Sequence, residues 1–391
     1  MSGIDHIFLY SLAFFLLLYF SIKNDKCHTR KEVFKLFIPS ALFYALIEAL
    51  RYDRGVDYLH YKDIYEVGYF EGTQLLFDCL NELLKNIGFS FTGALFVYEI
   101  ILLCGICFLI SSYSLKEGRW MYFFAILSML VLHENLIRQF VGMPFIFIAV
   151  HFMFEKKWSK MIIALLCANL IHSGTIFAFP FIAFSYYFFH LKIKAEIALL
   201  LLSVSYYLLN IDVGSLFSEV LQRINFGVLL FSDHLLHYVE ESDRWLGADS
   251  ILEGAQQSII TKSFQFIFEC SIIMSSYIAL CLRQEQKVQC FYNIMVFAFF
   301  MCRLVHGYEI LARMFGQLYI YWFIPFGYSL YIFSKNQVAL RSKGYLGLMR
   351  GCIIIACSYL CLYWGRFIYL NPEAVFIWNW NEKNITNSPS L

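Results

Sequence analysis

Charged side chains are concentrated directly after an apolar stretch near the start of the chain. In a protein that is 15% charged and 60% hydrophobic, the nine residues from Arg51 to Leu59 contain two arginines and two aspartates. Ionised side chains kept at the end of a membrane-spanning helix usually face a cavity or a substrate. Arginine binds phosphate oxygens in a bidentate manner. We therefore treat Arg51, Arg54 and Asp57 as candidate residues of a site for an anionic substrate.

The same motif continues with Tyr58, Tyr61 and Glu71. Gly55 within it allows the backbone to approach a ligand closely, because glycine has no side chain. The alternative is an interfacial anchor, in which arginine and tyrosine lie at the membrane surface and the charges of the motif pair with one another.

Arg138 and Gln139 lie about one helical turn inside the outer end of another apolar run, at 136–154. A helix N-terminus favours bound anions because its backbone N–H groups are free, and an arginine there adds positive charge. The alternative is that Arg138 extends outward to the membrane surface and binds no substrate.

His172 and Ser173 follow an apolar run, at 161–171, that is shorter than the roughly 20 residues needed to cross a bilayer. The pattern predicts a turn at His172 within or near the membrane. A neutral imidazole accepts a proton near neutral pH, so His172 is a candidate general base. A hydrogen-bonding role in the structure is the open alternative.

Arg303 and Arg313 flank the last outer connection together with Glu309. A role in ligand binding and an ion pair with Glu309 are equal alternatives for these arginines. Another group is spaced like metal ligands, but in a polar segment a solvated helix face is the favoured interpretation; it consists of His234, His237, Glu240 and Glu241. We therefore expect no metal ion and no other cofactor.

The composition is that of an integral membrane protein. The chain has 391 residues and a mean hydropathy of +0.62, and long apolar runs alternate with short charged loops, which excludes several soluble domains. A formal net charge of +1 gives no reason to expect a nucleic-acid partner. We predict an all-α polytopic protein in which residues 1–391 form a single membrane domain. The twelve candidate spans lie at 7–22, 36–50, 89–112, 120–133, 136–154, 161–171, 174–190, 195–211, 263–282, 289–305, 309–334 and 350–370.

The distribution of lysine and arginine predicts the orientation. When alternate connections are numbered as inside and outside, eighteen of the thirty Lys and Arg residues fall inside, which places both termini outside. The inside set is mostly lysine, whereas eight of the twelve outside residues are arginine. Because arginine suits bidentate binding of phosphate, the outer face is predicted to hold an anion.

Two outer segments are long enough to fold. Segment 51–88 contains apolar residues at helical spacing between Leu75 and Leu84, interleaved with charges, which predicts an amphipathic helix on the membrane surface. Segment 212–262 mixes apolar and charged residues and is a candidate lid.

Taken together, these motifs resemble the EpsG-like branch of the Wzy-type polysaccharide polymerases. The resemblance covers residues from about 30 to 190, and Arg313 is a looser match. It rests on the order of four features: Arg54-Gly55-x-Asp57-Tyr58-x-x-Tyr61, Glu71 in an amphipathic outer segment, Asn135-Leu136-Ile137-Arg138-Gln139 at the head of a span, and a short span that ends at His172-Ser173.

The resemblance implies a fold similar to the C class of membrane glycosyltransferases, located in the bacterial inner membrane with an active site that faces the periplasm or the exterior. It implies an O-antigen, capsule or exopolysaccharide polymerase that joins repeat units carried on undecaprenyl diphosphate. Donor and acceptor would both be lipid-linked glycans in contact with membrane lipid. A chain-length regulator and a flippase would be further partners.

The residues fit this chemistry on their own account. A lipid diphosphate leaving group carries about two negative charges, which arginines neutralise without a metal ion. The acceptor hydroxyl needs a base; Asp57, Glu71 and His172 are the alternatives, and we favour His172 because a neutral imidazole is available near neutral pH. A lipid-linked glycan flippase or transporter is an alternative function, although the chain shows no internal repeat of the kind common in transporters. A membrane O-acyltransferase is another, although it would leave the outer arginines without a phosphate.

Overall fold

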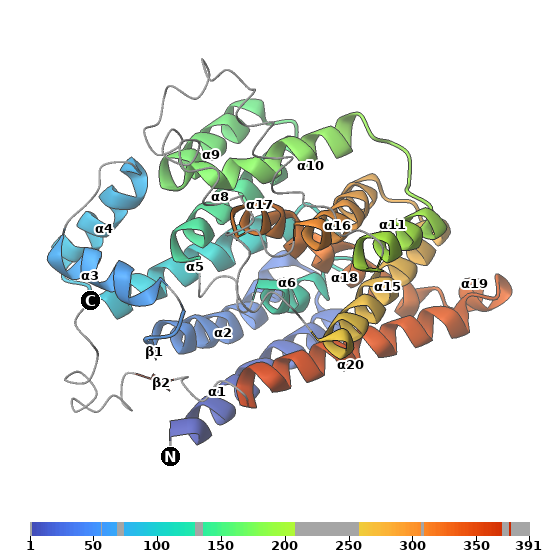
Figure 1. The fold of residues 1–391 in the computed structure, drawn as a ribbon, viewed down its shortest axis with the longest axis horizontal. Helices are drawn as coiled ribbons and strands as arrows, with labels where there is room; N and C mark the ends of the chain where they lie inside the picture. Colours follow the sequence, from blue (N-terminus) through green and yellow to red (C-terminus); the bar gives the residue numbers. More distant parts are fainter. Residues whose placement is uncertain are drawn as a thin grey trace. The chain divides into compact units, whose positions relative to one another are not determined.

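The computed structural model describes residues 2–55, 57–68, 74–129, 136–207, 258–305, 309–369 and 375–376. Of these residues 84% are helical, and the only strands among them are two segments of two residues each (Figure 1). The prediction of an all-α protein is therefore confirmed.

The chain divides into two compact units, of which unit 1 comprises residues 1–179 and 360–391 and unit 2 comprises residues 180–359. Unit 1 contains the helices α1 (Ser2–Lys23), α2 (Arg30–Ala49), α3 (Tyr58–Val67), α4 (Leu75–Ile87), α5 (Phe91–Ile110), α6 (Met121–Met129), α8 (Ile137–Phe154) and α9 (Trp158–Ile171), the 3-10 turns η1 (Asn24–Lys26) and η2 (Ser173–Phe177), and the strands β1 (Arg51–Tyr52) and β2 (Val375–Phe376).

Unit 2 contains α11 (Ala195–Tyr207), α15 (Ile259–Leu282), α16 (Gln286–Leu304), α17 (Glu309–Tyr319), η4 (Ile320–Trp322), α18 (Phe323–Lys335) and α19 (Gln337–Ser342). Two helices cross the boundary between the units, α10 (Ala178–Tyr187) and α20 (Leu346–Tyr369).

Within the described residues, each of the twelve predicted apolar runs coincides with a helix or with consecutive helices. By length and composition, six helices in the described part of the chain are able to cross a membrane: His6–Lys23, Phe91–Ile110, Ile137–Phe154, Ile259–Leu282, Gln286–Leu304 and Leu346–Arg366. The protein is therefore a multi-pass membrane protein, and the total number of spans stays a prediction.

Hydroxyl side chains mark the beginning of several helices. Thr29 accepts a hydrogen bond from the backbone N–H of Glu32, and Ser90 accepts one from that of Gly93. Ser258 caps α15 in the same way. Each cap satisfies one of the backbone donors that have no partner within the first turn of a helix.

One predicted span is interrupted. Within the apolar run at 309–334, α17 ends at Tyr319, η4 follows, and α18 begins at Phe323. Pro325 therefore lies in the first turn of α18, where proline's missing N–H leaves no intrahelical hydrogen bond unmade. This proline starts a helix and does not kink a continuous one.

The helices of unit 1 pack closely around α5 and α8. α5 contacts α2 and α8, and α8 contacts α9 (Figure 1). A Cβ atom on Gly105 of α5 would lie only 2.5 Å from the Cα of Pro144 in α8. Glycine is required at this position because the two backbones approach each other closely. In unit 2, α16 contacts α11, α15, α17 and α18.

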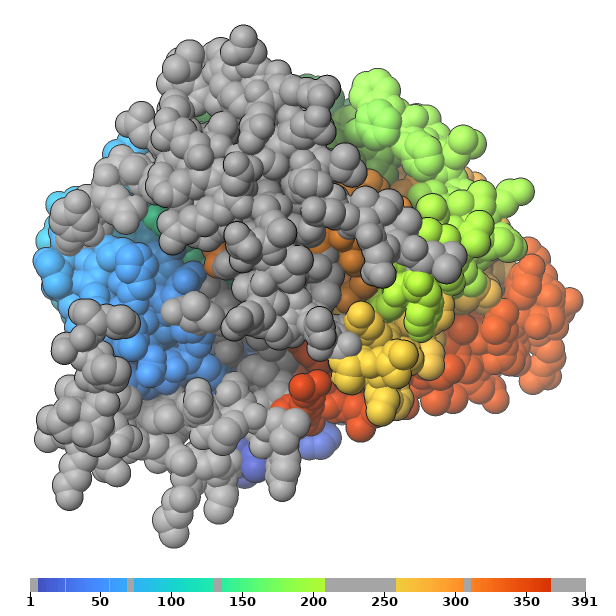
Figure 2. All heavy atoms as spheres, viewed as in Figure 1, coloured from blue at the N-terminus to red at the C-terminus, as the bar shows by residue number. Residues whose placement is uncertain are grey.

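Large apolar side chains are exposed along several helices. Leu200 of α11 is 64% exposed, Ile260 of α15 is 66% exposed and Leu362 of α20 is 67% exposed. The surfaces of α11 and α15 are lime and yellow in Figure 2. Soluble proteins rarely expose extended apolar patches, so these surfaces are suited to contact with lipid.

Candidate functional site

Unit 1 holds most of the residues that the sequence predicts for the site. Nine of them belong to it: Arg51, Arg54, Asp57, Tyr58, Tyr61, Arg138, Gln139, His172 and Ser173. Arg303 and Arg313 belong to unit 2. Outside the described residues lie Glu71, residues 212–257 of the candidate lid, and with them His234, His237, Glu240 and Glu241.

The backbone that carries Arg51 and Arg54 is held by a strand pair and a tight turn. β1 pairs with β2 in antiparallel orientation, with Arg51 opposite Phe376. The turn that follows has φ values of 47° at Asp53 and 101° at Gly55. Aspartate tolerates the left-handed conformation and glycine adopts it without strain, so these two residue types permit the turn.

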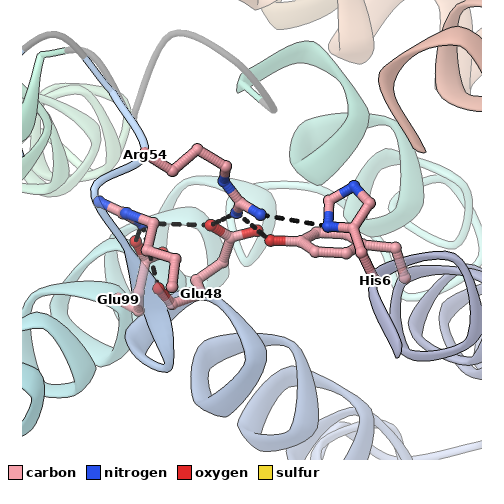
Figure 3. Close-up of polar contacts among 6 residues, drawn as sticks. His6, Glu48, Arg54 and Glu99 are labelled. Carbon is pink, nitrogen blue, oxygen red and sulfur yellow. Dashed lines mark hydrogen bonds and ion pairs between the residues drawn. The ribbon is translucent and has the colours of Figure 1, made fainter. Parts of the chain in front are cut away.

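Glu48, near the C-terminal end of α2, binds both arginines (Figure 3). Its Oε2 lies 3.1 Å from Arg51 Nη1 and 3.2 Å from Arg54 Nη2. Its Oε1 accepts a hydrogen bond of 2.6 Å from the hydroxyl of Tyr10 in α1. Glu99 of α5 provides a second carboxylate, whose Oε1 is 3.6 Å from Arg51 Nη1. The cluster therefore connects α1, α2, β1 and α5.

Arg54 also contacts α1 directly. Its Nη2 donates to the Tyr10 hydroxyl, and its guanidinium carbon lies 5.0 Å from the centre of the Tyr10 ring. Its Nη1 is 3.4 Å from His6 Nδ1. Because arginine N–H groups only donate, His6 Nδ1 accepts in this contact and the proton of the neutral ring is on Nε2.

The two guanidinium groups and the two carboxylates of this cluster balance in charge. Arg51 is 1% exposed and Arg54 is 5% exposed, so their charges are neutralised by protein groups. The alternative interpretation was that the charges of the motif pair with one another. The carboxylates that pair with these two arginines are Glu48 in α2 and Glu99 in α5, which lie outside the motif. An anion that bound Arg51 or Arg54 would compete with Glu48 and Glu99. Donor binding by these arginines stays a prediction.

Aromatic side chains of α3 pack against α4 and α5. Tyr58 and Tyr61 belong to an apolar cluster that includes Phe77, Phe91 and Ile137. Burial raises the pKa of the Tyr58 hydroxyl above its ordinary range. This hydroxyl therefore remains protonated near neutral pH.

Arg138, in the first turn of α8, lies over the ring of Tyr61. The guanidinium carbon is 5.5 Å from the ring centre, a cation–π distance. Arg138 is half-buried, whereas Gln139 is buried with 6% exposure. A guanidinium held over an aromatic face by its positive charge still carries N–H donors in its own plane, so this contact is compatible with phosphate binding.

His172 lies at a turn after α9, as the sequence predicted. Its backbone is extended, with φ −160° and ψ 109°. Its Nδ1 is 3.4 Å from Nε2 of Gln74, the residue before α4. A Cβ atom on Gly174 would lie 3.5 Å from both Cε1 and Nε2 of His172. Gln74 therefore lies at the Nδ1 edge of the imidazole, and Gly174 lies at the Nε2 edge.

Gln74 is placed to set the tautomer of His172. When the amide nitrogen donates to Nδ1, the proton of the neutral imidazole is on Nε2. When the amide oxygen accepts from Nδ1–H, the lone pair is on Nε2. In this second arrangement Nε2 is the atom that takes a proton from a substrate hydroxyl.

The α8–α9 hairpin brings Arg138 and His172 to the same end of unit 1. Ile137 of α8 and Ile171 of α9 belong to one apolar cluster. The Thr175 hydroxyl donates to the backbone oxygen of His172 at 2.7 Å. A Cβ atom on Gly142 of α8 would lie 2.8 Å from Thr175 Cγ2, so the turn at His172 packs against the N-terminal half of α8.

Arg303 takes part in a separate buried cluster in unit 2. Its Nη2 lies 2.9 Å from Oε1 of Glu269 in α15, which is completely buried. The hydroxyl of Tyr319 donates to the same oxygen at 3.1 Å, and that of Tyr206 donates to Oε2 at 3.0 Å. Arg303 therefore pairs with Glu269, whereas the side chain of Glu309, the partner considered from the sequence, lies outside the described residues. Arg313 is exposed.

The acidic members of both clusters had a signal in the sequence. Glu48, Glu99 and Glu269 are isolated acidic residues within apolar helices, where a charge must be paired or face a cavity. Tyr10 and Gln74 had no local signal, because their contacts join residues 38 and 98 positions apart.

Apolar helices able to cross a bilayer, with charged side chains paired in their interior, define a multi-pass α-helical membrane protein. A sequence profile of the EpsG family matches residues 34–372. The chain therefore belongs to the EpsG family, which confirms the resemblance in its motifs. No curated protein and no solved structure matches the chain. Family membership indicates a role like that of a polysaccharide polymerase.

Proposed function

We propose that this protein is a polymerase that joins oligosaccharide repeat units carried on undecaprenyl diphosphate into a surface polysaccharide. The observation that carries the proposal is the EpsG family match over residues 34–372. The position of Arg138 and His172 at one end of the α8–α9 hairpin supports it. We place the reaction at the outer face of the bacterial inner membrane.

In the proposed reaction the acceptor hydroxyl attacks the anomeric carbon of the donor glycan. A carbon–oxygen bond to the acceptor forms as the bond to the diphosphate oxygen breaks, and the diphosphate leaves with the electron pair. Arg138 stabilises the charge that develops on the leaving group. His172 Nε2 takes the hydroxyl proton; for this the Gln74 amide turns from the orientation in the structure, so that its oxygen accepts a hydrogen bond from Nδ1–H.

In this proposal Arg51 and Arg54 stabilise the structure and do not bind the donor directly. Their ion pairs with Glu48 and Glu99 hold together α2 and α5, and α3 packs against α5. Tyr61 of α3 in turn contacts Arg138. The donor diphosphate would reach Arg54 only in exchange for Glu48.

The direct test is the conversion of a purified lipid-linked repeat unit into a ladder of chain lengths. Arg138→Lys keeps the charge but loses the bidentate geometry, and should reduce polymer roughly tenfold, since a hydrogen bond to a charged group is worth about 1.5–3 kcal/mol. Arg341→Lys, at an exposed position of α19, is the matched control and should leave the yield unchanged. His172→Ala should abolish chain extension while donor binding is retained.

The outcomes separate the alternative functions. Movement of the lipid-linked unit across a vesicle membrane with no ladder would identify a flippase, and transfer of an acyl group would identify an O-acyltransferase. A normal ladder from Arg138→Lys would leave polymerisation established and remove Arg138 from the donor site.

A further inference from the structure

Unit 2 contains a cavity of about 500 Å³ between α10, the segment that follows it, and α16. This volume lies within the range of roughly 300–1,000 Å³ that is typical of ligand sites. The wall is mostly apolar and is formed mainly by Phe181, Phe184, Phe189, Ile193, Ile294 and Phe297. A ligand that fills this space is therefore largely hydrocarbon.

The two polar residues of the wall are engaged with protein groups. Ser185 Oγ donates to the backbone oxygen of Cys290 at 3.1 Å. Asn293 Nδ2 donates to the backbone oxygen of Leu191 at 3.0 Å, and its Oδ1 accepts from the N–H of Ile193 at 3.2 Å. These bonds satisfy the polar atoms and leave the apolar surface to the ligand.

Amide side chains on successive turns of α16 hold the end of α10 and the segment between α10 and α11. Asn293 holds it as described, and Gln289 Nε2 donates to the backbone oxygen of His190 at 2.6 Å. Gln286 donates to the backbone oxygen of Tyr186 at 3.3 Å. These hydrogen bonds hold the cavity wall in place before a ligand binds, which reduces the conformational entropy lost on binding.

Two lysines, Lys192 and Lys194, flank the lining residue Ile193, although neither of them lines the cavity itself. Lys192 Nζ is 3.0 Å from the sulfur of Cys281 and 4.7 Å from the centre of the Tyr277 ring, and both are weak partners for an ammonium group. Among the described residues, no carboxylate forms an ion pair with either lysine.

We propose that this cavity binds an acyl chain of an anionic phospholipid, with the lipid phosphate held by Lys192 and Lys194. Basic pockets beside membrane helices select anionic head groups, and the apolar wall contributes van der Waals packing against the acyl chain. The positive-inside pattern of the sequence assigns this segment to the cytoplasmic face, where anionic lipids are available. The proposal does not depend on the polymerase assignment.

Native mass spectrometry of the full-length protein tests the head-group preference. Dioleoyl phosphatidylglycerol should remain bound under conditions that remove dioleoyl phosphatidylcholine, and glycerol phosphate without acyl chains should not bind. Lys192→Gln/Lys194→Gln should weaken phosphatidylglycerol binding roughly thirtyfold, or about fivefold for each lysine near a charged lipid surface. Lys335→Gln/Lys343→Gln removes two exposed charges from the same unit and is the matched control; its affinity should equal that of the unmodified protein.

The position of the chain is tested on the unmodified protein with a phosphatidylglycerol that carries a photoreactive group in its acyl chain. Labelled peptides should contain the phenylalanines of α10 and Phe297 of α16. Equal retention of the two phospholipids, unchanged affinity of the double lysine variant, or labelling confined to other helices would each overturn the proposal. Polymerisation is not measured in either experiment, so a failure here does not affect the proposed function.

Discussion

The exchange of Glu48 for glutamine tests whether charge holds the buried cluster of unit 1 together. Glu48→Gln keeps the shape of the side chain and leaves two guanidinium groups with the single carboxylate of Glu99. Glu48 is 0% exposed, and its oxygens lie 2.6 to 3.2 Å from Tyr10, Arg51 and Arg54. Removal of one partner from a buried ion pair costs about 3–5 kcal/mol, because the remaining charge stays desolvated. We expect the free energy of unfolding to fall by this amount.

A second exchange restores the charge balance and makes the reasoning quantitative. Glu48→Gln/Arg54→Gln leaves one guanidinium group, on Arg51, and one carboxylate, on Glu99. The double variant should therefore lose less free energy of unfolding than the two single variants lose together. The difference, the coupling energy, should be about 2–3 kcal/mol, near the upper end of values for residues in contact.

The measurement is equilibrium denaturation of the purified protein in detergent. Glu82→Gln, at an exposed position of α4, is the matched control and should change the free energy of unfolding by less than about 0.5 kcal/mol. A loss below about 1 kcal/mol for Glu48→Gln, or strict additivity in the double variant, would refute the role of charge in this cluster.

Other contacts predict outcomes of their own. Glu269→Gln should lower the free energy of unfolding by about 3–5 kcal/mol, because it leaves a buried arginine without its carboxylate; stability equal to that of the wild type would contradict the pairing. Gln74→Glu places a carboxylate about 3.4 Å from His172 Nδ1, which favours the charged imidazole. Because the proposed base acts in its neutral form, activity should be lost at higher pH than in the wild type as the solution is acidified, while Asn86→Asp at the exposed end of α4 leaves the pH profile unchanged; coincident profiles would exclude the contact from catalysis. Gly105→Ala directs a Cβ atom to within 2.5 Å of a backbone carbon of α8 and should cost about 1–3 kcal/mol in stability; an unchanged melting temperature would show that α5 and α8 tolerate separation.

The helices were predictable where local chemistry marks them. The apolar run at 89–112 and the cap at Ser90 predict α5, and apolar residues at helical spacing predict α4. The turn at His172 follows from the shortness of the run before it. The interruption of the 309–334 run had one signal in the sequence, Pro325, but its position at η4 did not, because Ile320–Trp322 is as apolar as the helices on either side. The pairing of β1 with β2 was not predictable either, since it joins segments from opposite ends of the chain.

The candidate site was predictable in its residue types and only partly in its contacts. The motif order identified Arg54, Arg138 and His172 as a group, and the structure places all three in unit 1. The cation–π contact of Arg138 with Tyr61 became visible only in the folded chain, because α3 and α8 meet through tertiary packing. The other two predicted arginines, Arg303 and Arg313, belong to unit 2. Arg303 pairs with the buried Glu269.

By itself the sequence determined that the protein is helical and embedded in a membrane, and it revealed the motifs of its family. Hydropathy and motif order depend on residue types along the chain, so they can be read without the fold. Only the tertiary structure decided which charge neutralises which. A desolvated charge is stabilised by the counter-charge that packing brings within a few ångströms, as Glu48 is brought to Arg54 and Glu269 to Arg303. Those distances depend on how the helices pack and not on their order in the sequence.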